Sequence, residues 1–222
     1  MLVDSTDAYR LWAESYDDDP NPVLALAQRV VREKLHPLFG RTLLDIATGT
    51  GYWAAYCREQ GATVFGIDRS PEMLARATSK RYLKDRLVCA DMLRLPIRDA
   101  TVDVAICSFA VGYVESVADL FHEMARVSRS IIVIDLHPTA IETGWQRGFR
   151  AGDQRYLIRQ FSHSPAELDR AAFSAGLQLA WRSESYIGEP ERPIFLRAGR
   201  EQALETASRV PAILSSCWER LC

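Results

Sequence analysis

The sequence predicts an α/β domain built around a mostly parallel β-sheet. Short apolar, β-branched runs alternate with segments that suit helices, which is typical of parallel strands joined by right-handed crossovers. Three of the runs are closed by an aspartate, at Asp45, Asp68 and Asp91. The carboxyl ends of parallel strands share one edge of the sheet, and open α/β folds bind ligands at that edge. With 222 residues, 48% of them hydrophobic, the chain can bury such a core without disulfides.

The first half of the chain contains helices and strands in turn. Tyr9, Trp12 and Tyr16 lie at helical spacing and predict an amphipathic helix near the N-terminus. Ser70 followed by Pro71 is typical of a helix start, with a capping side chain and then proline at the first helical position. The elements expected in this half are helices over 5–19, 21–34, 50–60 and from 70 onward, and strands over 42–46, 63–68 and 87–90.

The second half continues this alternation and then changes. Ser164 and Glu167 form a capping box that predicts a helix start. The elements expected here are strands over 102–108, 131–135, 177–186 and 211–218, helices over 119–127 and 164–176, and a helix within 189–208. The last two strands are expected to be antiparallel. The whole chain is interpreted as one domain, 1–222, with an N-terminal helical cap over 1–40 and a substrate-facing excursion over 138–163.

Composition excludes several classes of protein. The net charge of −2 and a pI of about 6.1 argue against nucleic acid as the main partner. No apolar run reaches the roughly 18 residues of a membrane span, and no signal peptide precedes the domain, so a cytoplasmic location is expected. The cysteines are scattered and form no CxxC pair or Cys/His cluster, so no metal site is expected. They are Cys57, Cys89, Cys107, Cys217 and Cys222.

The turn after the first predicted sheet strand is the strongest motif. Residues 49–54 satisfy the pattern G-x-G-x-x-A, which by itself suits a dinucleotide. Asp45 would repel a pyrophosphate, but it suits a cationic amino group. Asp68 lies 68 − 49 = 19 residues past Gly49, where an acid reaches a ribose hydroxyl, and Asp91 can accept from an adenine amino group. An amino group, a ribose and an adenine together describe S-adenosylmethionine (SAM).

Four motifs in order resemble the class I SAM-dependent methyltransferases, in particular their small-molecule members of the methyltransferase domain 11/25 type. They are Leu-Asp-Ile-Ala-Thr-Gly-Thr-Gly at 44–51, Gly-Ile-Asp-Arg-Ser-Pro-Glu-Met-Leu at 66–74, Ala-Asp-Met at 90–92, and Val-Asp-Val-Ala-Ile-Cys-Ser at 102–108. The resemblance extends from Tyr9 to about Trp218. It implies a Rossmann-like fold with a seven-stranded, mostly parallel sheet, an antiparallel last strand, and helices on both faces. One departure is Ala47, where the family usually has glycine.

The resemblance also implies which residues contact SAM, with S-adenosylhomocysteine (SAH) as the product. Asp45 would hold the methionine amino group through water, Asp68 the ribose hydroxyls, and Asp91 the adenine amino group. Tyr9 and Tyr16 would close over the cofactor. The full set of expected cofactor contacts is Tyr9, Tyr16, Asp45, Ala47, Gly49, Gly51, Asp68, Arg69, Met73, Asp91, Met92, Ser108 and Phe109.

The sequence gives weaker indications of which residues bind the acceptor and which could act as a general base. His137 follows the fifth predicted strand at the ligand-binding edge, and is the candidate general base; His163 is a second candidate. The alternative for His137 is simple turn chemistry ahead of Pro138. The candidate substrate-binding residues are Tyr113, His137, Trp145, Arg150, Tyr156 and His163. The arginines at 147, 150 and 155 permit an anionic acceptor, although a solvated surface has the same composition.

The expected function is SAM-dependent methyl transfer to an oxygen, nitrogen or carbon atom of a small metabolite, by a monomer or homodimer without a nucleic-acid or membrane partner. Two alternatives remain. One is a SAM-binding protein without transferase activity, and the other is an NAD-dependent oxidoreductase, against which Asp45 and Asp91 argue.

Overall fold

The computed structural model describes residues 1–18, 20–35, 38–80 and 82–220. Its centre is a seven-stranded sheet with the strand order β4-β3-β2-β5-β6-β10-β9. In that order the strands are β4 (Leu87–Cys89), β3 (Thr63–Asp68), β2 (Thr42–Ile46), β5 (Val102–Ser108), β6 (Ser128–Leu136), β10 (Ile213–Arg220) and β9 (Leu177–Ser185). The first five strands are parallel, and β10 is antiparallel to both of its neighbours. The predicted fold class is therefore confirmed, including the antiparallel last strand.

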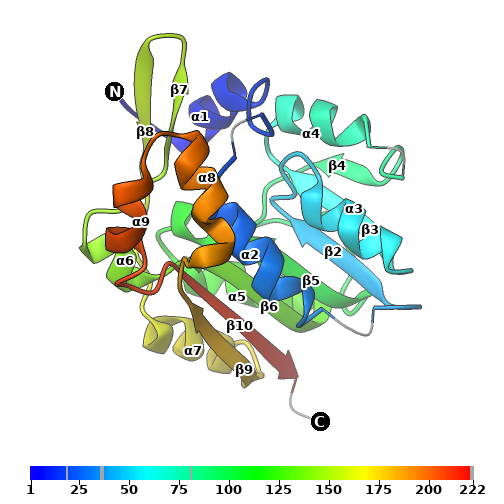
Figure 1. The fold of residues 1–222 in the computed structure, drawn as a ribbon. Helices are drawn as coiled ribbons and strands as arrows, with labels where there is room; N and C mark the ends of the chain where they lie inside the picture. Colours follow the sequence, from blue (N-terminus) through cyan, green and yellow to red (C-terminus); the bar gives the residue numbers. More distant parts are fainter. Residues whose placement is uncertain (19, 36–37, 81, 221–222) are drawn as a thin grey trace.

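Helices cover both faces of the sheet (Figure 1). The helices are α1 (Ser5–Trp12), α2 (Pro22–Arg32), α3 (Tyr52–Glu59), α4 (Pro71–Thr78), α5 (Val117–Val127), α6 (Pro138–Glu142), α7 (Pro165–Ser174), α8 (Arg192–Arg197) and α9 (Glu201–Ala207), with short 3₁₀ turns η1 (Val111–Tyr113) and η2 (Glu189–Glu191). One buried cluster joins α5 and α7 to the sheet, and a second joins α2, α3, α8 and α9 to the other face.

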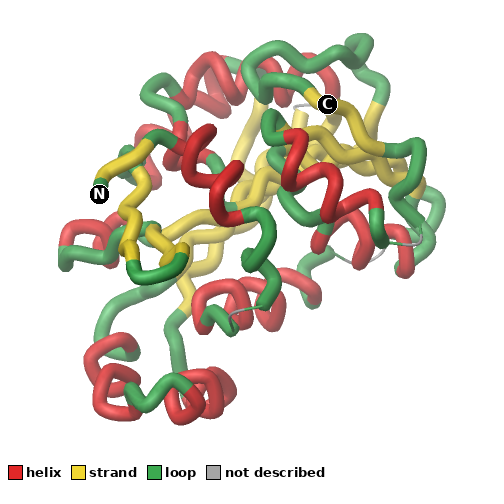
Figure 2. Tube along the Cα trace, turned by 90° about the horizontal axis from the view of Figure 1, so that it is seen from above, coloured by secondary structure: helices red, strands yellow, loops and turns green. Residues whose placement is uncertain are grey.

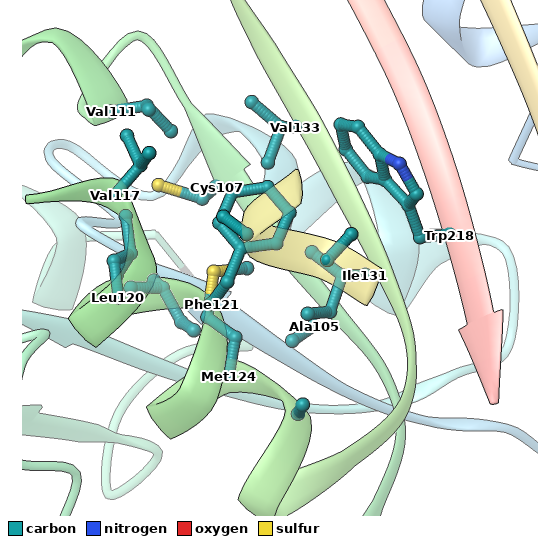
Figure 3. Close-up of a cluster of buried hydrophobic side chains, with 14 of the residues drawn as sticks. Ala105, Cys107, Val111, Val117, Leu120, Phe121, Met124, Ile131, Val133 and Trp218 are labelled. Carbon is teal, nitrogen blue, oxygen red and sulfur yellow. The ribbon is translucent and has the colours of Figure 1, made fainter. Parts of the chain in front are cut away.

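The core under α5 shows how side-chain periodicity fixes this packing. Leu120, Phe121 and Met124 lie at helical spacing and are fully buried. They meet inward-facing residues of β5, β6 and β10, as Figure 3 shows. The rings of Phe121 and Trp218 lie edge to face with their centroids 5.1 Å apart. Burial of each such side chain contributes roughly 1.5–3 kcal/mol, so this contact secures the antiparallel end of the sheet.

A second, three-stranded sheet lies beside the N-terminus (Figure 2). Its strands are β1 (Leu2–Val3), β7 (Gly148–Ala151) and β8 (Gln154–Ile158). β7 and β8 form an antiparallel hairpin, and β1 adds to β8 in parallel. The hairpin occupies the middle of the region 138–163, where the sequence shows no regular pattern, and α6 occupies its start. The N-terminal segment and this excursion are thus joined by backbone pairing.

Several element bounds differ from the sequence prediction. The N-terminal helix α1 ends at Trp12, and turns follow up to residue 18. β6 starts at Ser128 directly after α5, and two helices rather than one follow η2. Local signals predicted the presence of these elements. Their ends depend on tertiary contacts, such as the hydrogen bond from Ser128 Oγ to the carbonyl of Met124 at 2.7 Å.

Candidate active site

A cavity of about 420 Å³ lies at the carboxyl edge of the sheet, between that edge and the N-terminal segment. It is lined by residues that follow β2, β3, β4 and β5, and by Tyr9 and Tyr16 from the N-terminal segment. The predicted cofactor residues that line it are Tyr9, Tyr16, Ala47, Gly49, Asp68, Arg69, Met73, Asp91, Met92, Ser108 and Phe109. Asp45 and Gly51 do not line it. The structure therefore brings most of the predicted cofactor contacts to one cavity.

Asp68 is held rigidly at the end of β3. Its Oδ2 accepts the backbone N–H of Gly49 at 2.8 Å, and its Oδ1 accepts that of Ser70 at 2.9 Å. Burial raises the pKa of Asp68 above its ordinary value, and these two backbone N–H groups oppose that rise. Each carboxylate oxygen has a further lone pair, so Asp68 can also accept from ligand hydroxyls in the cavity.

The turn after β2 relies on left-handed backbone conformations. Ala47 has φ of 55°, Gly49 of 56° and Gly51 of 79°. An L-residue in this region has a steric cost that glycine lacks, which explains why glycine is usual at the position of Ala47. Gly51 has a packing role as well, because a Cβ there would lie 2.6 Å from Leu83 Cδ1. Gly51 therefore lets α3 begin close to α4 and the segment after it.

Asp45 lies beneath the cavity rather than in its wall. It is 1% exposed, and its Oδ2 accepts the hydroxyl of Thr48 at 2.6 Å and the backbone N–H of Ala54 at 3.0 Å. Burial raises the pKa of Asp45 to about 7, against the opposing effect of these two hydrogen bonds. In the structure this carboxyl group fastens the glycine turn to the first turn of α3.

The β4 end of the cavity carries Asp91 and Met92, which follow that strand, and Met73 of α4 lines the cavity as well. Asp91 Oδ1 accepts the backbone N–H of Leu93 at 2.9 Å, which fixes the carboxylate. Met73 is 1% exposed, and its Cε would lie 3.3 Å from a Cβ built on Gly49. Two methionines and one fixed carboxylate make this end suitable for a flat, apolar ring with an amino group at its edge.

The N-terminal segment is tied across the mouth of the cavity. Thr50 donates its hydroxyl to Asp17 Oδ1 at 2.8 Å, and Lys80 Nζ lies 3.6 Å from Asp17 Oδ2. At the other end of the segment, the Arg69 guanidinium donates to the hydroxyl of Thr6. These contacts come from the glycine turn and from residues on either side of α4, so they tie the segment to two neighbouring parts of the sheet edge.

A pair of tyrosines lines both this cavity and a smaller one beside it. The hydroxyls of Tyr9 and Tyr113 are 2.7 Å apart. Burial raises the pKa of both groups, and of Tyr16, above the ordinary value of 10.0. The tyrosine hydroxyls therefore stay protonated near neutral pH, where they can donate as well as accept hydrogen bonds.

The smaller cavity has a volume of about 130 Å³. Of the candidate substrate-binding residues, Tyr113 and Trp145 line it. Arg150 and Tyr156 instead lie on the β7–β8 hairpin, where Arg150 is exposed and the Tyr156 ring stacks on Phe149 with centroids 5.0 Å apart. They are not among the residues lining either cavity.

The two candidate general bases also lie elsewhere. His137 is 6% exposed, caps α6 by accepting the Thr139 N–H at Nδ1 (3.1 Å), and has Nε2 3.5 Å from Glu184 Oε1. His163 Nε2 lies 2.9 Å from the carbonyl of Val114. Neither lines the 420 Å³ or the 130 Å³ cavity. Thus the position of His137 favours the turn chemistry that its sequence context also allowed.

Some residues of the site carried no signal in the sequence. Ser5 and Thr6 line the larger cavity, while Val23 and Leu24 line the smaller one. Their positions depend on how the N-terminal segment folds back over the sheet edge. The pairing of β1 with β8, more than 150 residues later, sets that path.

Comparisons with known proteins agree with this geometry. Residues 44–131 match the family model described as a methyltransferase domain. The chain is 32% identical over 130 residues to the malonyl-[acyl-carrier protein] O-methyltransferase of Pectobacterium atrosepticum, which covers 54% of the chain and 51% of that relative. It is 36% identical over 102 residues to the demethylmenaquinone methyltransferase of Corynebacterium kroppenstedtii, covering 46% and 43%. The chain spans about half the length of the curated relatives it matches.

Among solved structures, a SAM-dependent methyltransferase from Mesorhizobium loti superposes with a TM-score of 0.69 at 20% identity, covering 90% of this chain and all of that one. The fold is therefore the one seen in solved SAM-dependent methyltransferases, and the match of residues 44–131 to a methyltransferase domain agrees with the resemblance that the four motifs indicate.

Proposed function

We propose that the protein transfers the methyl group of SAM to an oxygen, nitrogen or carbon atom of a small molecule. The observation that carries this proposal is the fixed carboxylate of Asp68 in the larger cavity, hydrogen-bonded to the glycine turn of the neighbouring strand. NAD and SAM both carry ribose hydroxyls and an adenine amino group for Asp68 and Asp91, and the match of residues 44–131 to a methyltransferase domain favours SAM between the two.

The residues that line the cavity carry chemical groups that can bind SAM. Asp68 would accept the ribose hydroxyls, Asp91 the adenine amino group, and Met73 and Met92 would enclose the adenine ring. Asp45 would act indirectly, because it holds the turn that faces the methionine part. When bound, SAM supplies a methyl group on a sulfonium centre, which is already a good leaving group.

The contribution of the chain is positioning and the exclusion of water, which together can lower a barrier by about 7–11 kcal/mol. The N-terminal segment, tied to Thr50 and Lys80 through Asp17, covers the cavity. Aromatic faces from Tyr9, Tyr16 and Phe109 line it, and a cation near such faces gains about 1 kcal/mol or more.

Proton transfer is assigned to no histidine, because His137 and His163 lie outside both cavities. Tyr9 and Tyr113 line both cavities, and their hydroxyls, which contact one another, remain protonated. We assign them to orienting the acceptor by hydrogen bonds.

Location and assembly form a separate proposal. Among the described residues, no helix is both long and apolar enough to span a membrane. The cysteines at 57, 89, 107 and 217 are free thiols, as is usual in a reducing compartment. We propose a cytoplasmic enzyme that acts on a small molecule as a monomer or homodimer, and size-exclusion chromatography with light scattering tests the assembly.

Transfer of an isotopically labelled methyl group tests the activity. The protein is incubated with methyl-labelled SAM and a panel of small phenols, amines and activated carbon acids. Appearance of label in an acceptor, together with SAH, supports the proposal. SAM binding with label retained in the cofactor across the whole panel would support the non-catalytic alternative.

A further inference from the structure

The smaller cavity opens beside the cofactor cavity and shares walls with it. Tyr9, Tyr16, Phe109 and Tyr113 line both. A molecule in the smaller cavity would therefore lie directly beside a molecule in the larger one. This is the position that an acceptor needs for in-line attack on a group held in the larger cavity.

The lining of the smaller cavity suits a flat, apolar molecule. Trp12, Trp145 and Phe109 contribute aromatic rings, and Leu24 and Leu136 contribute aliphatic surface. The volume of about 130 Å³ is close to the roughly 150 Å³ of an apolar cavity that admits one benzene ring. The cavity thus matches one ring of an acceptor.

Arg147 is the charged residue among those that line this cavity. Its side chain is 9% exposed, its guanidinium donates to Asp135 Oδ1, and its Nη1 donates to Gln160 Oε1 at 3.1 Å. It also lies over the Tyr113 ring, with Cζ 5.0 Å from the centroid. Within the described part of the chain, its buried Nε has no hydrogen-bond partner. Nε is itself shielded from the cavity, but the two Nη atoms carry four N–H groups, of which Asp135 and Gln160 each accept one, so an oxygen of a ligand can accept from the guanidinium.

Gly112 allows the Arg147 side chain to pack close to the backbone. A Cβ on Gly112 would overlap with Arg147 Nη1, so glycine leaves room for the guanidinium. The backbone N–H of Gly112 donates to Asp135 Oδ2 at 2.8 Å. The same glycine thus contacts both members of the ion pair and keeps them together beneath the cavity.

Asp135 determines whether the cavity favours a neutral or an anionic ligand. Its side chain is 14% exposed and neutralises the Arg147 guanidinium directly. The two other arginines that suggested an anionic acceptor, Arg150 and Arg155, are exposed on the hairpin and do not line this cavity. An anionic ligand in the smaller cavity would lose its hydration, and it would find the charge of Arg147 already balanced by that of Asp135.

We propose that the smaller cavity holds the methyl acceptor and selects an uncharged, ring-bearing molecule whose oxygen accepts a hydrogen bond from the Arg147 guanidinium. This inference rests on the proposed methyltransferase function. Arg147 is the specificity-determining residue, and Asp135 sets the preference for a neutral over an anionic ring.

Three matched one-ring probes test the inference: acetophenone with a neutral carbonyl, benzoate with a carboxylate, and ethylbenzene without oxygen. Their affinities for the SAH-loaded protein are measured by NMR titration at pH 7. Acetophenone is expected to bind at least about tenfold more tightly than either of the others, a difference of about 1.4 kcal/mol. Tighter binding of benzoate, or equal binding of ethylbenzene, would overturn the proposal.

Asp135→Asn then tests the role of the ion pair. The amide oxygen can still accept the Gly112 N–H, while Arg147 keeps an uncompensated charge. The ratio of benzoate to acetophenone affinity should rise by about tenfold or more. Asp99→Asn removes an exposed carboxylate that pairs with Arg126 and serves as the control, with no change in the ratio. An unchanged ratio in a folded Asp135→Asn protein would contradict the assignment.

Leu24→Trp separates this inference from the proposed function. Leu24 is half-buried on α2 and lines the smaller cavity only, so a larger side chain there should fill it. We expect acetophenone binding to fall by at least about tenfold, with SAH affinity unchanged. Probe binding that survives this substitution overturns the acceptor cavity and leaves the proposed function standing. Failure of SAH to bind the wild-type protein instead defeats the proposed function, and the probes are then titrated into the free protein, where they still report on the cavity.

Discussion

Asp68 and Gly49 join two neighbouring strands of the sheet through one hydrogen bond, from the Gly49 N–H to Asp68 Oδ2 at 2.8 Å. The carboxylate at the end of β3 thereby holds the turn at the end of β2. The residue that faces the ligand cavity is also the residue that keeps the glycine turn in place. We therefore expect a change of this side chain to affect cofactor binding and turn geometry together.

Asp68→Asn should weaken SAH binding by well over tenfold. An amide has one acceptor oxygen, so it cannot receive both the Gly49 and Ser70 N–H groups through carboxylate oxygens and also hold ligand hydroxyls. Titration calorimetry measures the loss. Asp103→Asn is the matched control, because Asp103 also accepts a backbone N–H, from Thr42, yet lies outside the cavity. Unchanged affinity in Asp68→Asn would refute the ribose assignment.

Asp45→Asn should remove a pH dependence of stability. Burial raises the pKa of Asp45 to about 7. Between about pH 4 and pH 7 the unfolded chain has lost this proton while the folded chain retains it, so the free energy of unfolding falls as the pH rises through this window. The loss is on the order of a few kcal/mol.

Denaturant unfolding at pH 4.5 and pH 7.5 measures this difference. The change between the two values should be smaller in Asp45→Asn than in the wild type, whereas exposed Asp99→Asn should behave as the wild type. Identical changes in the wild type and Asp45→Asn would show that Asp45 has an ordinary pKa.

Ala47→Gly should raise thermal stability. Ala47 has φ of 55°, a conformation that costs an L-residue about 1–2 kcal/mol, and the greater freedom of glycine in the unfolded chain offsets part of that relief. We expect a gain of about 0.5–1 kcal/mol. Ala55→Gly within α3 is the control and should lower stability by about 1 kcal/mol. A lower melting temperature for Ala47→Gly would mean that the turn carries no such strain.

Asp17→Asn should speed the release of SAH. The side chain links the N-terminal segment to Thr50 and Lys80, and partly exposed contacts of this kind contribute up to about 1 kcal/mol. Stopped-flow displacement should show dissociation about three- to fivefold faster. Neighbouring Asp18→Asn, an exposed residue, should leave the rate unchanged. Equal rates for both variants would argue against closure by this segment.

The sheet, the glycine turn and the strand-end carboxylates could be predicted because each follows from a local pattern. The direction of each side chain could not. Asp45 and Asp68 both lie near the ends of apolar strands. The Asp45 carboxylate accepts the backbone N–H of Ala54 inside the fold, whereas Asp68 lines the cavity. His137 looked well placed in the sequence, but its ring caps α6.

The smaller cavity was beyond prediction for a similar reason. It forms where α1 and α2 meet the segment from Trp145 to Gly148, and no local pattern encodes that contact. The ion pair of Asp135 and Arg147 joins a strand end to this segment across 12 positions of sequence. The sequence showed the arginine without showing its partner.

Titration calorimetry of the wild-type protein with SAH and, separately, with NAD⁺ is the most direct test of the cofactor assignment. We predict that SAH binds at one site per chain and that NAD⁺ does not compete with it. Binding of NAD⁺ without binding of SAH would contradict the assignment and, with it, the proposed methyl transfer.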